Sequence, residues 1–419
     1  MRLGGEGEAL PLGTGIRSLE RPQVKFLLRL LFISLLAGLA GCGSSSFEGE
    51  VTPPIAPFYP TVYRIGVLAP LDAGSVEFGR GIRNSVILAV ERWNAQAQPF
   101  GPFFEVVAVD DSSDPNVGLA NLPQLLNTPN LVGVVGTYNS GVATAVLPTL
   151  EAEGIPLLSP GNTDPALTLG PDSNNPSRPF DNYFRLVARD DLQGPALAEY
   201  AFSNLGVTRV AILTEEKEVS QTLASNFQTR FQALGGTITA LEIAPEGTTD
   251  YSLLLGNLAA TSPELLFYAG EVPSGSTVRD QATGAGLAVT LMGGDGLNAQ
   301  SYIDDATVST EGDVASAPGV AVELLPSGAE FLADYQSAGF AEPATFFGPY
   351  AFDAANLLIR ATVQNGPESQ SVLAFLEQVN TIGVTGQLAF DQFGDALNQA
   401  VTLYVVRADV FVPDEVVKP

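Results

Sequence analysis

The chain has no histidine and a single cysteine, and these two absences remove much of enzyme chemistry. Zinc sites of thiolate or imidazole ligands, Ser-His-Asp triads, Cys-His dyads and internal disulfides are all excluded. Basic residues are also few: 19 Lys and Arg stand against 46 Asp and Glu, for a net charge of -27. This balance argues against a nucleic-acid partner, because basic groups must neutralise the phosphates. Chemistry based on carboxylates alone, such as glycoside hydrolysis or an all-oxygen metal site, stays open.

The apolar run near the amino terminus, Leu30 to Gly41, is only 12 residues long and follows four basic residues. Such a length is typical of a signal peptide, whereas a membrane-spanning helix needs about 20 residues. Cys42 comes next, and Leu39-Ala40-Gly41-Cys42 resembles the lipobox of bacterial lipoprotein signals. We therefore expect a signal peptide over 1–41, lipidation of Cys42 and a proline-containing tether over 42–60. The alternatives are a signal anchor or an ordinary buried cysteine.

The rest of the chain alternates short apolar runs with stretches of helical periodicity, which predicts an α/β protein with parallel sheets. The expected strands are Tyr63 to Leu68, Phe103 to Val109, Leu131 to Val135, Ile155 to Leu158, Val210 to Leu213, Thr237 to Ile243, Leu265 to Tyr268, Val289 to Met292 and Val401 to Val406. The expected helices are Gly79 to Trp93, Gly118 to Leu126, Gly141 to Glu153, Gln193 to Leu205, Ser220 to Leu234, Ser252 to Ala260 and Thr277 to Gly284.

One strand-loop-helix-strand unit occurs twice. Its first copy runs from Leu131 and its second from Leu265. The glycine after the first strand and the residue after the second strand are 23 positions apart in both copies, namely Gly136 and Ser159 in the first and Gly270 and Gly293 in the second. The repeat predicts two similar lobes. Each lobe offers ligand-binding loops at the carboxyl ends of its strands, as open α/β sheets do.

Seven motifs in register resemble the leucine/isoleucine/valine-binding proteins of ABC importers, over about Tyr63 to Phe411. They are the Arg64-Ile65-Gly66-Val67-Leu68-Ala69-Pro70-Leu71 strand, the Asp110-Asp111-Ser112-Ser113-Asp114-Pro115 turn, Glu153-Gly154-Ile155-Pro156, Ser159-Pro160-Gly161-Asn162-Thr163-Asp164-Pro165, Arg185 through Gln193-Gly194, Gly293-Gly294-Asp295-Gly296, and Phe390-Asp391-Gln392-Phe393-Gly394-Asp395. The resemblance implies a type I periplasmic binding fold: two Rossmann-like lobes joined by a three-stranded hinge, with no cofactor and no reaction. The chain would cross between lobes near 185–188, 317–319 and 395–401.

The same resemblance places a small zwitterion between the lobes. Ser140 would bind its carboxylate, Thr163 both of its ends, the Gly161 carbonyl its ammonium, and Asp295 the ammonium from the second lobe. Phe78 would lie against the ligand side chain, and Asn139, Asn162 and Glu271 complete the candidate site. From the residues alone, Ser140 and Thr163 can equally be helix caps, Asp295 an ordinary turn residue, and Phe78 a core residue.

The family often has a tyrosine where this chain has Val219 and another near Glu271; neither is present here, although Tyr138 and Tyr268 lie close by. The loss of these aromatic walls and the gain of Glu271, beside Glu215 and Glu216, favour a more polar or cationic cargo. Asp110, Asp111 and Asp114 lack the spacing of a calcium loop and predict a solvated turn, and 391–395 predicts a hairpin.

These observations predict an extracytoplasmic solute-binding lipoprotein, held at the membrane by its lipid, that captures an amino acid for an ABC permease and ATPase complex. Lobe 1 would comprise 61–186 and 318–397, and lobe 2 would comprise 187–317 and 398–413. A lipoprotein sensor or protein-interaction module with the same fold is the main alternative, and a carboxylate-based enzyme is a third.

Overall fold

The computed structural model describes residues 61–97, 101–173 and 175–418. Cys42, the predicted signal peptide and the predicted tether lie outside the described residues. Within the described ranges, no helix combines the length and apolar character that crossing a membrane requires.

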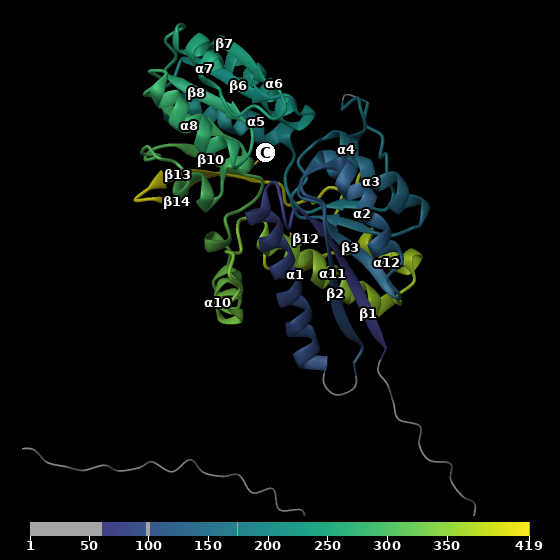
Figure 1. The fold of residues 1–419 in the computed structure, drawn as a ribbon. Helices are drawn as coiled ribbons and strands as arrows, with labels where there is room; N and C mark the ends of the chain where they lie inside the picture. The colour runs from purple at the N-terminus through teal and green to yellow at the C-terminus, as the bar shows by residue number, and fades with distance from the viewer. Residues whose placement is uncertain (1–60, 98–100, 174, 419) are drawn as a thin grey trace, which may run out of the picture. The chain divides into compact units, whose positions relative to one another are not determined.

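The first sheet contains five parallel strands in the order β2-β1-β3-β4-β5. Figure 1 labels β1, β2 and β3 of this sheet. Its strands are β1 Val62–Ala69, β2 Phe103–Asp110, β3 Leu131–Gly136, β4 Leu157–Ser159 and β5 Tyr183–Arg185. In β1, Ile65 and Val67 pack on one face of the sheet and Leu68 on the other, because successive side chains of a strand alternate. Both faces are apolar, as a parallel sheet covered by helices requires.

Helices cover both faces of the first sheet. Helices α1 and α11 pack together on one face, and α2 and α3 pack together on the other. The helices of this lobe are α1 Val76–Ala97, α2 Pro115–Leu126, α3 Ser140–Ala152, α4 Ala166–Leu169, α10 Gly328–Ala338, α11 Gly348–Asn365 and α12 Ser369–Leu376. We call this sheet with its helices the first lobe; a small hairpin of β11 Thr381–Gly383 and β12 Gly386–Leu388 also belongs to it.

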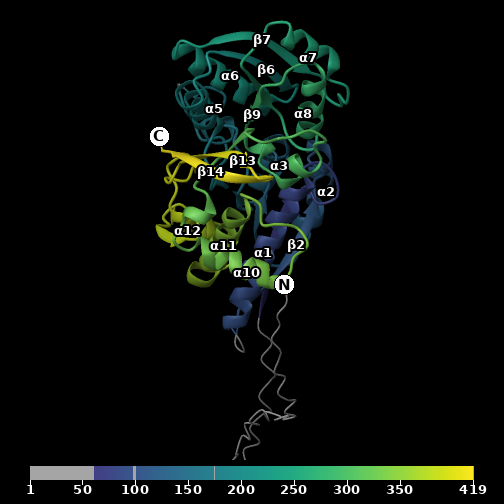
Figure 2. The ribbon, with the colours of Figure 1, turned by 90° about the vertical axis from the view of Figure 1, so that its left-hand side faces the viewer.

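The second lobe is built around a seven-stranded sheet in the order β14-β13-β10-β9-β8-β6-β7. Its strands are β6 Arg209–Glu215, β7 Thr237–Ala244, β8 Leu265–Ala269, β9 Thr290–Gly293, β10 Val314–Ala317, β13 Val401–Arg407 and β14 Val410–Val417. Its helices are α5 Asp190–Glu199, α6 Glu218–Ala233, α7 Ser252–Ala259, α8 Ser274–Gly284 and α9 Gln300–Asp304, and Tyr200–Asn204 continues α5 as one π-helical turn. The hairpin β13–β14, yellow in Figure 2, adds the two antiparallel strands at one edge.

Three chain crossings join the lobes side by side. The first leads from β5 to α5, the second leaves β10, and the third enters β13. The crossings are hydrogen-bonded to one another: the Ala188 N–H donates to the Pro318 carbonyl at 2.9 Å, and the Ala396 N–H donates to the Arg185 carbonyl at 2.9 Å. The predicted two-lobed α/β fold with a three-stranded hinge is thereby confirmed.

All nine predicted strands are present, and the repeated unit corresponds to β3-α3-β4 in one lobe and β8-α8-β9 in the other. Several elements had no prediction, namely β5, β10, β11, β12, β14, α4, α9, α10, α11 and α12. The short strands among them have three or four residues, too few for periodicity to register. Helix α11 is mostly buried, although polar residues recur at helical spacing along it at Asp353, Asn356, Arg360 and Gln364, a pattern that indicates a helix and had no prediction.

Candidate functional site

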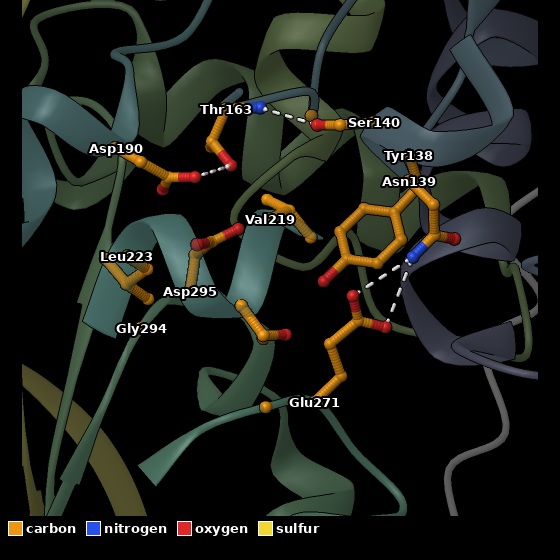
Figure 3. A pocket seen from close by; sticks show the side chains of 14 residues that line it. Tyr138, Asn139, Ser140, Thr163, Asp190, Val219, Leu223, Glu271, Gly294 and Asp295 are labelled. Carbon is orange, nitrogen blue, oxygen red and sulfur yellow. Dashed lines mark hydrogen bonds between the residues drawn. The ribbon is translucent and has the colours of Figure 1, made fainter. Parts of the chain in front are cut away.

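A small pocket lies where the carboxyl ends of strands from both sheets meet (Figure 3). The volume not filled by protein atoms is about 430 Å³, and this figure includes open solvent at the mouth of the pocket. The residues that line it are Tyr138, Asn139, Ser140, Gly161, Thr163, Asp190, Val219, Ser220, Leu223, Gly270, Glu271, Gly294, Asp295 and Gly296. They follow β3 and β4 in the first lobe and β8 and β9 in the second, or belong to α5 and α6. Six of the eight residues predicted from the sequence as ligand-binding are thus brought together at this pocket.

One side of the pocket presents hydrogen-bond donors at the start of α3. Ser140 is the first residue of this 13-residue helix, and the first backbone donors with helical partners are Val142 and Ala143. The N–H groups of Ser140 and Gly141 are therefore unused by the helix and carry its partial positive charge. The Ser140 Oγ accepts from the Thr163 N–H and the Asp164 N–H, each at 3.3 Å. This loop-helix junction suits an anion such as a carboxylate.

The opposite side presents a pair of buried carboxyl groups held by one amide. The Gln193 Nε2 donates to Asp190 at 2.9 Å and to Asp295 at 2.8 Å, while its Oε1 accepts from Ser316. Thr163 Oγ1 donates to Asp190 at 3.1 Å and so ties the first lobe to α5. A cation between these two carboxyl groups would be well satisfied.

Burial perturbs both of these acids. It raises the pKa of Asp295 to about 6, even though the hydrogen bond from Gln193 works in the other direction. Burial also raises the pKa of Asp190 well above its ordinary value, and the negative charge of Asp295 adds to this rise. Two carboxyl groups held together without a cation keep protons more readily than isolated ones. Asp190 is not among the site residues that the sequence predicts. The one sequence feature that points to it is its position as an acidic residue just after the predicted lobe crossing at 185–188.

Glu271 forms a third part of the pocket and spans the cleft. Its carboxylate accepts from Asn139 Nδ2 at 3.1 and 3.2 Å and from Ser75 Oγ at 3.0 Å, both on the first lobe. The ammonium of Lys217 lies 3.6 Å from Glu271 and 3.0 Å from Glu215. The charge of Glu271 is the main cause that raises the pKa of Lys217. In α3, Asn139 is the N-cap residue but makes no side-chain cap bond, because its amide is directed to Glu271 (Figure 3).

Two predicted site residues do not line the pocket. Phe78 is fully buried in α1, stacked on Tyr138 at 4.8 Å between ring centroids and edge-on to Phe347, so it supports the pocket wall from behind. Asn162 is also fully buried, and its Nδ2 donates to the Thr137 and Tyr138 carbonyls at 3.0 and 2.9 Å. Both residues therefore support the loop that carries Tyr138 from the interior of the first lobe: Phe78 packs on its ring, and Asn162 bonds its backbone.

The acidic turn after β2 is partly buried, which differs from the solvated turn predicted from the sequence. Asp110 accepts from the Leu71 and Ser112 N–H groups, while Asp111 has no solvent exposure. Burial raises the pKa of Asp111 to about 7. No group of three or more acidic or cysteine side chains in the described ranges is arranged to hold a metal ion. The 391–395 segment does turn back on itself, with an antiparallel bridge between Phe390 and Ala396, as predicted.

Comparison with known proteins matches the chain to one family over most of its length. The model of the periplasmic binding protein family matches residues 62–410. The Leu/Ile/Val-binding protein homolog 2 of Brucella abortus is 29% identical over 344 residues, which cover 79% of this chain and 86% of the relative. A leucine-, isoleucine-, valine-, threonine- and alanine-binding protein of Pseudomonas aeruginosa is 24% identical, over 83% of this chain and 90% of the relative.

Solved structures share the fold. The branched-chain amino acid substrate-binding protein of Streptococcus pneumoniae, in complex with isoleucine, superposes with a TM-score of 0.76 at 24% identity and covers 86% of this chain and all of its own. A solute-binding protein of R. palustris in complex with benzoate gives a TM-score of 0.73 at 18% identity and covers 85% of this chain and 96% of its own. The two-lobed architecture, the cleft pocket and the family match agree: this chain belongs to the periplasmic binding protein family and has its type I fold.

Proposed function

We propose that the protein captures an amino acid, or a similar small zwitterion, outside the cytoplasm and delivers it to an ABC importer. The observation that carries this proposal is the division of the pocket into a side of hydrogen-bond donors and a side of carboxyl groups. Unused N–H groups and the Ser140 hydroxyl stand on one side, and the buried carboxyl groups of Asp190 and Asp295 stand on the other. The carboxylate and ammonium of an amino acid match these sides in kind and order.

A bound zwitterion would also explain the two-lobed design. Ser140 belongs to the first lobe and Asp295 to the second, so a ligand held by both residues bridges the lobes. We propose that lobe 1 comprises 61–186 and 318–397, that lobe 2 comprises 187–317 and 398–413, and that rotation at the three crossings opens and closes the cleft. Ligand binding would shift this equilibrium because the bridging contacts exist only in the closed state.

The family and the relatives support this role. Members of the family work outside the cytoplasm, and several relatives are named for the amino acids they bind. We propose that the partners are the permease and ATPase subunits of an importer, and that the protein itself uses no cofactor and catalyses no reaction.

Lipid attachment through Cys42 is part of the same proposal. The sole cysteine of the chain follows a short apolar run and small residues, as lipid attachment requires. The test is the distribution of the full chain between membrane and soluble fractions of a bacterial host. The wild type should incorporate labelled fatty acid and stay with membranes, whereas Cys42→Ser should incorporate none. Equal fatty-acid labelling of the two forms would contradict lipidation.

The decisive experiment for cargo capture is a thermal-shift screen of all amino acids against the chain from Ser44 onward. This form keeps the whole compact unit Phe58–Pro419. A cargo that binds the folded state raises the unfolding midpoint, because binding stabilises that state by mass action. Ser140→Ala and Asp295→Ala should each abolish the shift and leave the unliganded midpoint nearly unchanged. If no amino acid raises the midpoint, the proposal fails; if both variants lose basal stability, these residues are structural caps.

A further inference from the structure

The pocket holds more negative charge than a neutral zwitterion needs. Three carboxyl groups line it, those of Asp190, Asp295 and Glu271, and no lysine or arginine is among the described residues that line it. Asp190 and Asp295 are bridged by Gln193 and are sufficient to receive one ammonium group. Glu271 is therefore a surplus acid, and its side chain is only 15% exposed. Its charge therefore acts more strongly than it would in water.

The cation nearest to Glu271 neutralises only part of this surplus. Lys217 lies closer to Glu215, at 3.0 Å, than to Glu271, at 3.6 Å, so one ammonium serves two carboxylates. Lys217 is also 42% exposed and is therefore partly in contact with water. The hydrogen bonds from Asn139 and Ser75 orient Glu271 but carry no charge. The cluster of Glu215, Lys217 and Glu271 thus keeps a net negative charge of one.

Glu271 occupies the end of the pocket away from the proposed ammonium site. In Figure 3, Thr163 and Asp190 lie on one side, Glu271 lies on the other beneath Tyr138, and Val219 lies between them. A ligand anchored at Ser140 and Asp295 would extend its side chain past Val219 toward Glu271. Val219, which lines the pocket on this path, has a small side chain without polar groups.

The backbone of the second lobe fixes Glu271 in this position. A Cβ atom at Gly296 would lie 2.8 Å from the Glu271 Cγ and 2.7 Å from the Gly270 carbonyl. The absence of a side chain at Gly296 lets its loop pack directly on the backbone of Gly270 and Glu271, whereas the space beside Gly270 is taken by the ring of Tyr268 and the carboxylate of Glu215. The rim adds Glu216, Glu218 and Glu246, with Lys217 as the one cation among the described residues that line it. Such a rim attracts cations and gives no net steering to neutral zwitterions.

We propose that the cargo is an amino acid with a positively charged side chain, and that Glu271 receives the charged end. This inference rests on the proposed function, since it assumes that the backbone groups of the cargo are held at Ser140 and Asp295. The cargo cation forms a charge-assisted hydrogen bond with Glu271 and shares this carboxylate with Lys217 or displaces Lys217 from it. The added charge of the cargo brings the cluster to neutrality.

The test uses pairs of amino acids that match in shape and differ in charge. Calorimetric titration of the chain from Ser44 onward compares arginine with citrulline and lysine with norleucine. The charged member of each pair should bind at least tenfold more tightly. Glu271→Gln should remove this preference and leave citrulline binding nearly unchanged, whereas Glu91→Gln, an identical charge change at an exposed position of α1, should preserve it.

A second variant separates a charge effect from a folding effect. Lys217→Met leaves Glu215 and Glu271 without their shared ammonium, so arginine should bind several-fold more tightly and citrulline as before. Loss of binding from a damaged fold would not produce this gain. Equal affinity for charged and neutral members, or unchanged preference in Glu271→Gln, overturns the cationic cargo and leaves the amino-acid function intact. Failure of every amino acid to bind overturns both.

Discussion

The guanidinium of Arg185 lies 2.8 Å from the carboxylate of Asp395, and the two side chains are 0% and 1% exposed. The pair joins the first and third lobe crossings, 210 residues apart in the chain. Arg189 adds a second contact to Asp395 at 2.7 Å, and Arg185 further donates to Thr168 and to the Asp164 carbonyl. The hinge is therefore organised around one buried acid with two cations.

Asp395→Asn should destabilise the protein by about 3–5 kcal/mol, because it leaves Arg185 buried without its counter-charge. Urea unfolding of the unliganded protein measures this loss. Glu105→Gln, which breaks the exposed pair with Arg64, should change the unfolding free energy by less than about 1 kcal/mol. Similar losses in the two variants would show that the buried Arg185–Asp395 pair contributes no more to the unfolding free energy than an exposed ion pair does.

The same pair predicts acid sensitivity. Burial alone raises the pKa of Asp395, but the charges of Arg185 and Arg189 outweigh burial and lower that pKa below its ordinary value. A lowered folded pKa contributes stability that is present above the unfolded pKa of about 4 and is lost as pH falls through the folded value. Asp395→Asn should lack this part of the stability loss below pH 4.

Cargo affinity and unliganded stability should change in opposite directions near pH 6. The raised pKa of Asp295, about 6, means that its ionised form is disfavoured in the folded protein. The unliganded protein should therefore gain stability as pH falls from 7 through 6 toward 4. An ammonium ligand needs the ionised acid, so affinity should fall over the same interval, and binding below pH 6 should release protons. Calorimetry in buffers of different ionisation enthalpy measures this release; an affinity independent of pH would contradict the assignment.

Asp190→Asn should separate binding from stability. The change removes one charged partner of the ligand ammonium, worth about 1.5–3 kcal/mol, and should weaken binding by roughly 10- to 150-fold. Because burial of the ionised Asp190 is unfavourable in the empty protein, its unfolding free energy should stay equal or rise. Titration and urea unfolding of the same preparation test both parts. A variant that loses stability together with affinity would indicate a structural role.

Gly136→Ala should be strongly destabilising, because Gly136 ends β3 with φ at +145° and a Cβ there would lie 2.2 Å from the Leu68 carbonyl oxygen. We expect a loss of about 2–4 kcal/mol, since backbone atoms must move to relieve the clash. Gly284→Ala is the matched control: it lies in α8 with no atom within 4 Å of the added Cβ. It should leave stability equal or raise it by up to about 1 kcal/mol. Thermal unfolding distinguishes the two variants.

Much of the fold could be predicted from local sequence pattern. The apolar runs that became β1, β3, β6 and β8 are buried on both faces, so their burial is visible in the sequence itself. The site was partly predictable for a related reason. Parallel strands end at one edge of a sheet, so polar residues after β3 and β4 must converge in the first lobe, and those after β8 and β9 must converge in the second.

Only the tertiary structure decided the remaining features of the site. Asp190 starts a helix beyond a lobe crossing, and no local pattern indicates that it faces Asp295. The sequence predicts Phe78 and Asn162 as site residues, but their side chains are buried in the core of the first lobe. Asn139 meets Glu271 across 132 residues.

The sequence by itself determined the fold class, the exclusion of histidine chemistry and of thiol chemistry beyond Cys42, and the loops that carry the site. The tertiary structure decided which acids share the pocket, which acid is in surplus and which pair holds the hinge. The physical reason is that periodicity along the chain specifies which face of an element is buried. Contacts between segments more than 100 residues apart depend instead on how the crossings set one sheet against the other.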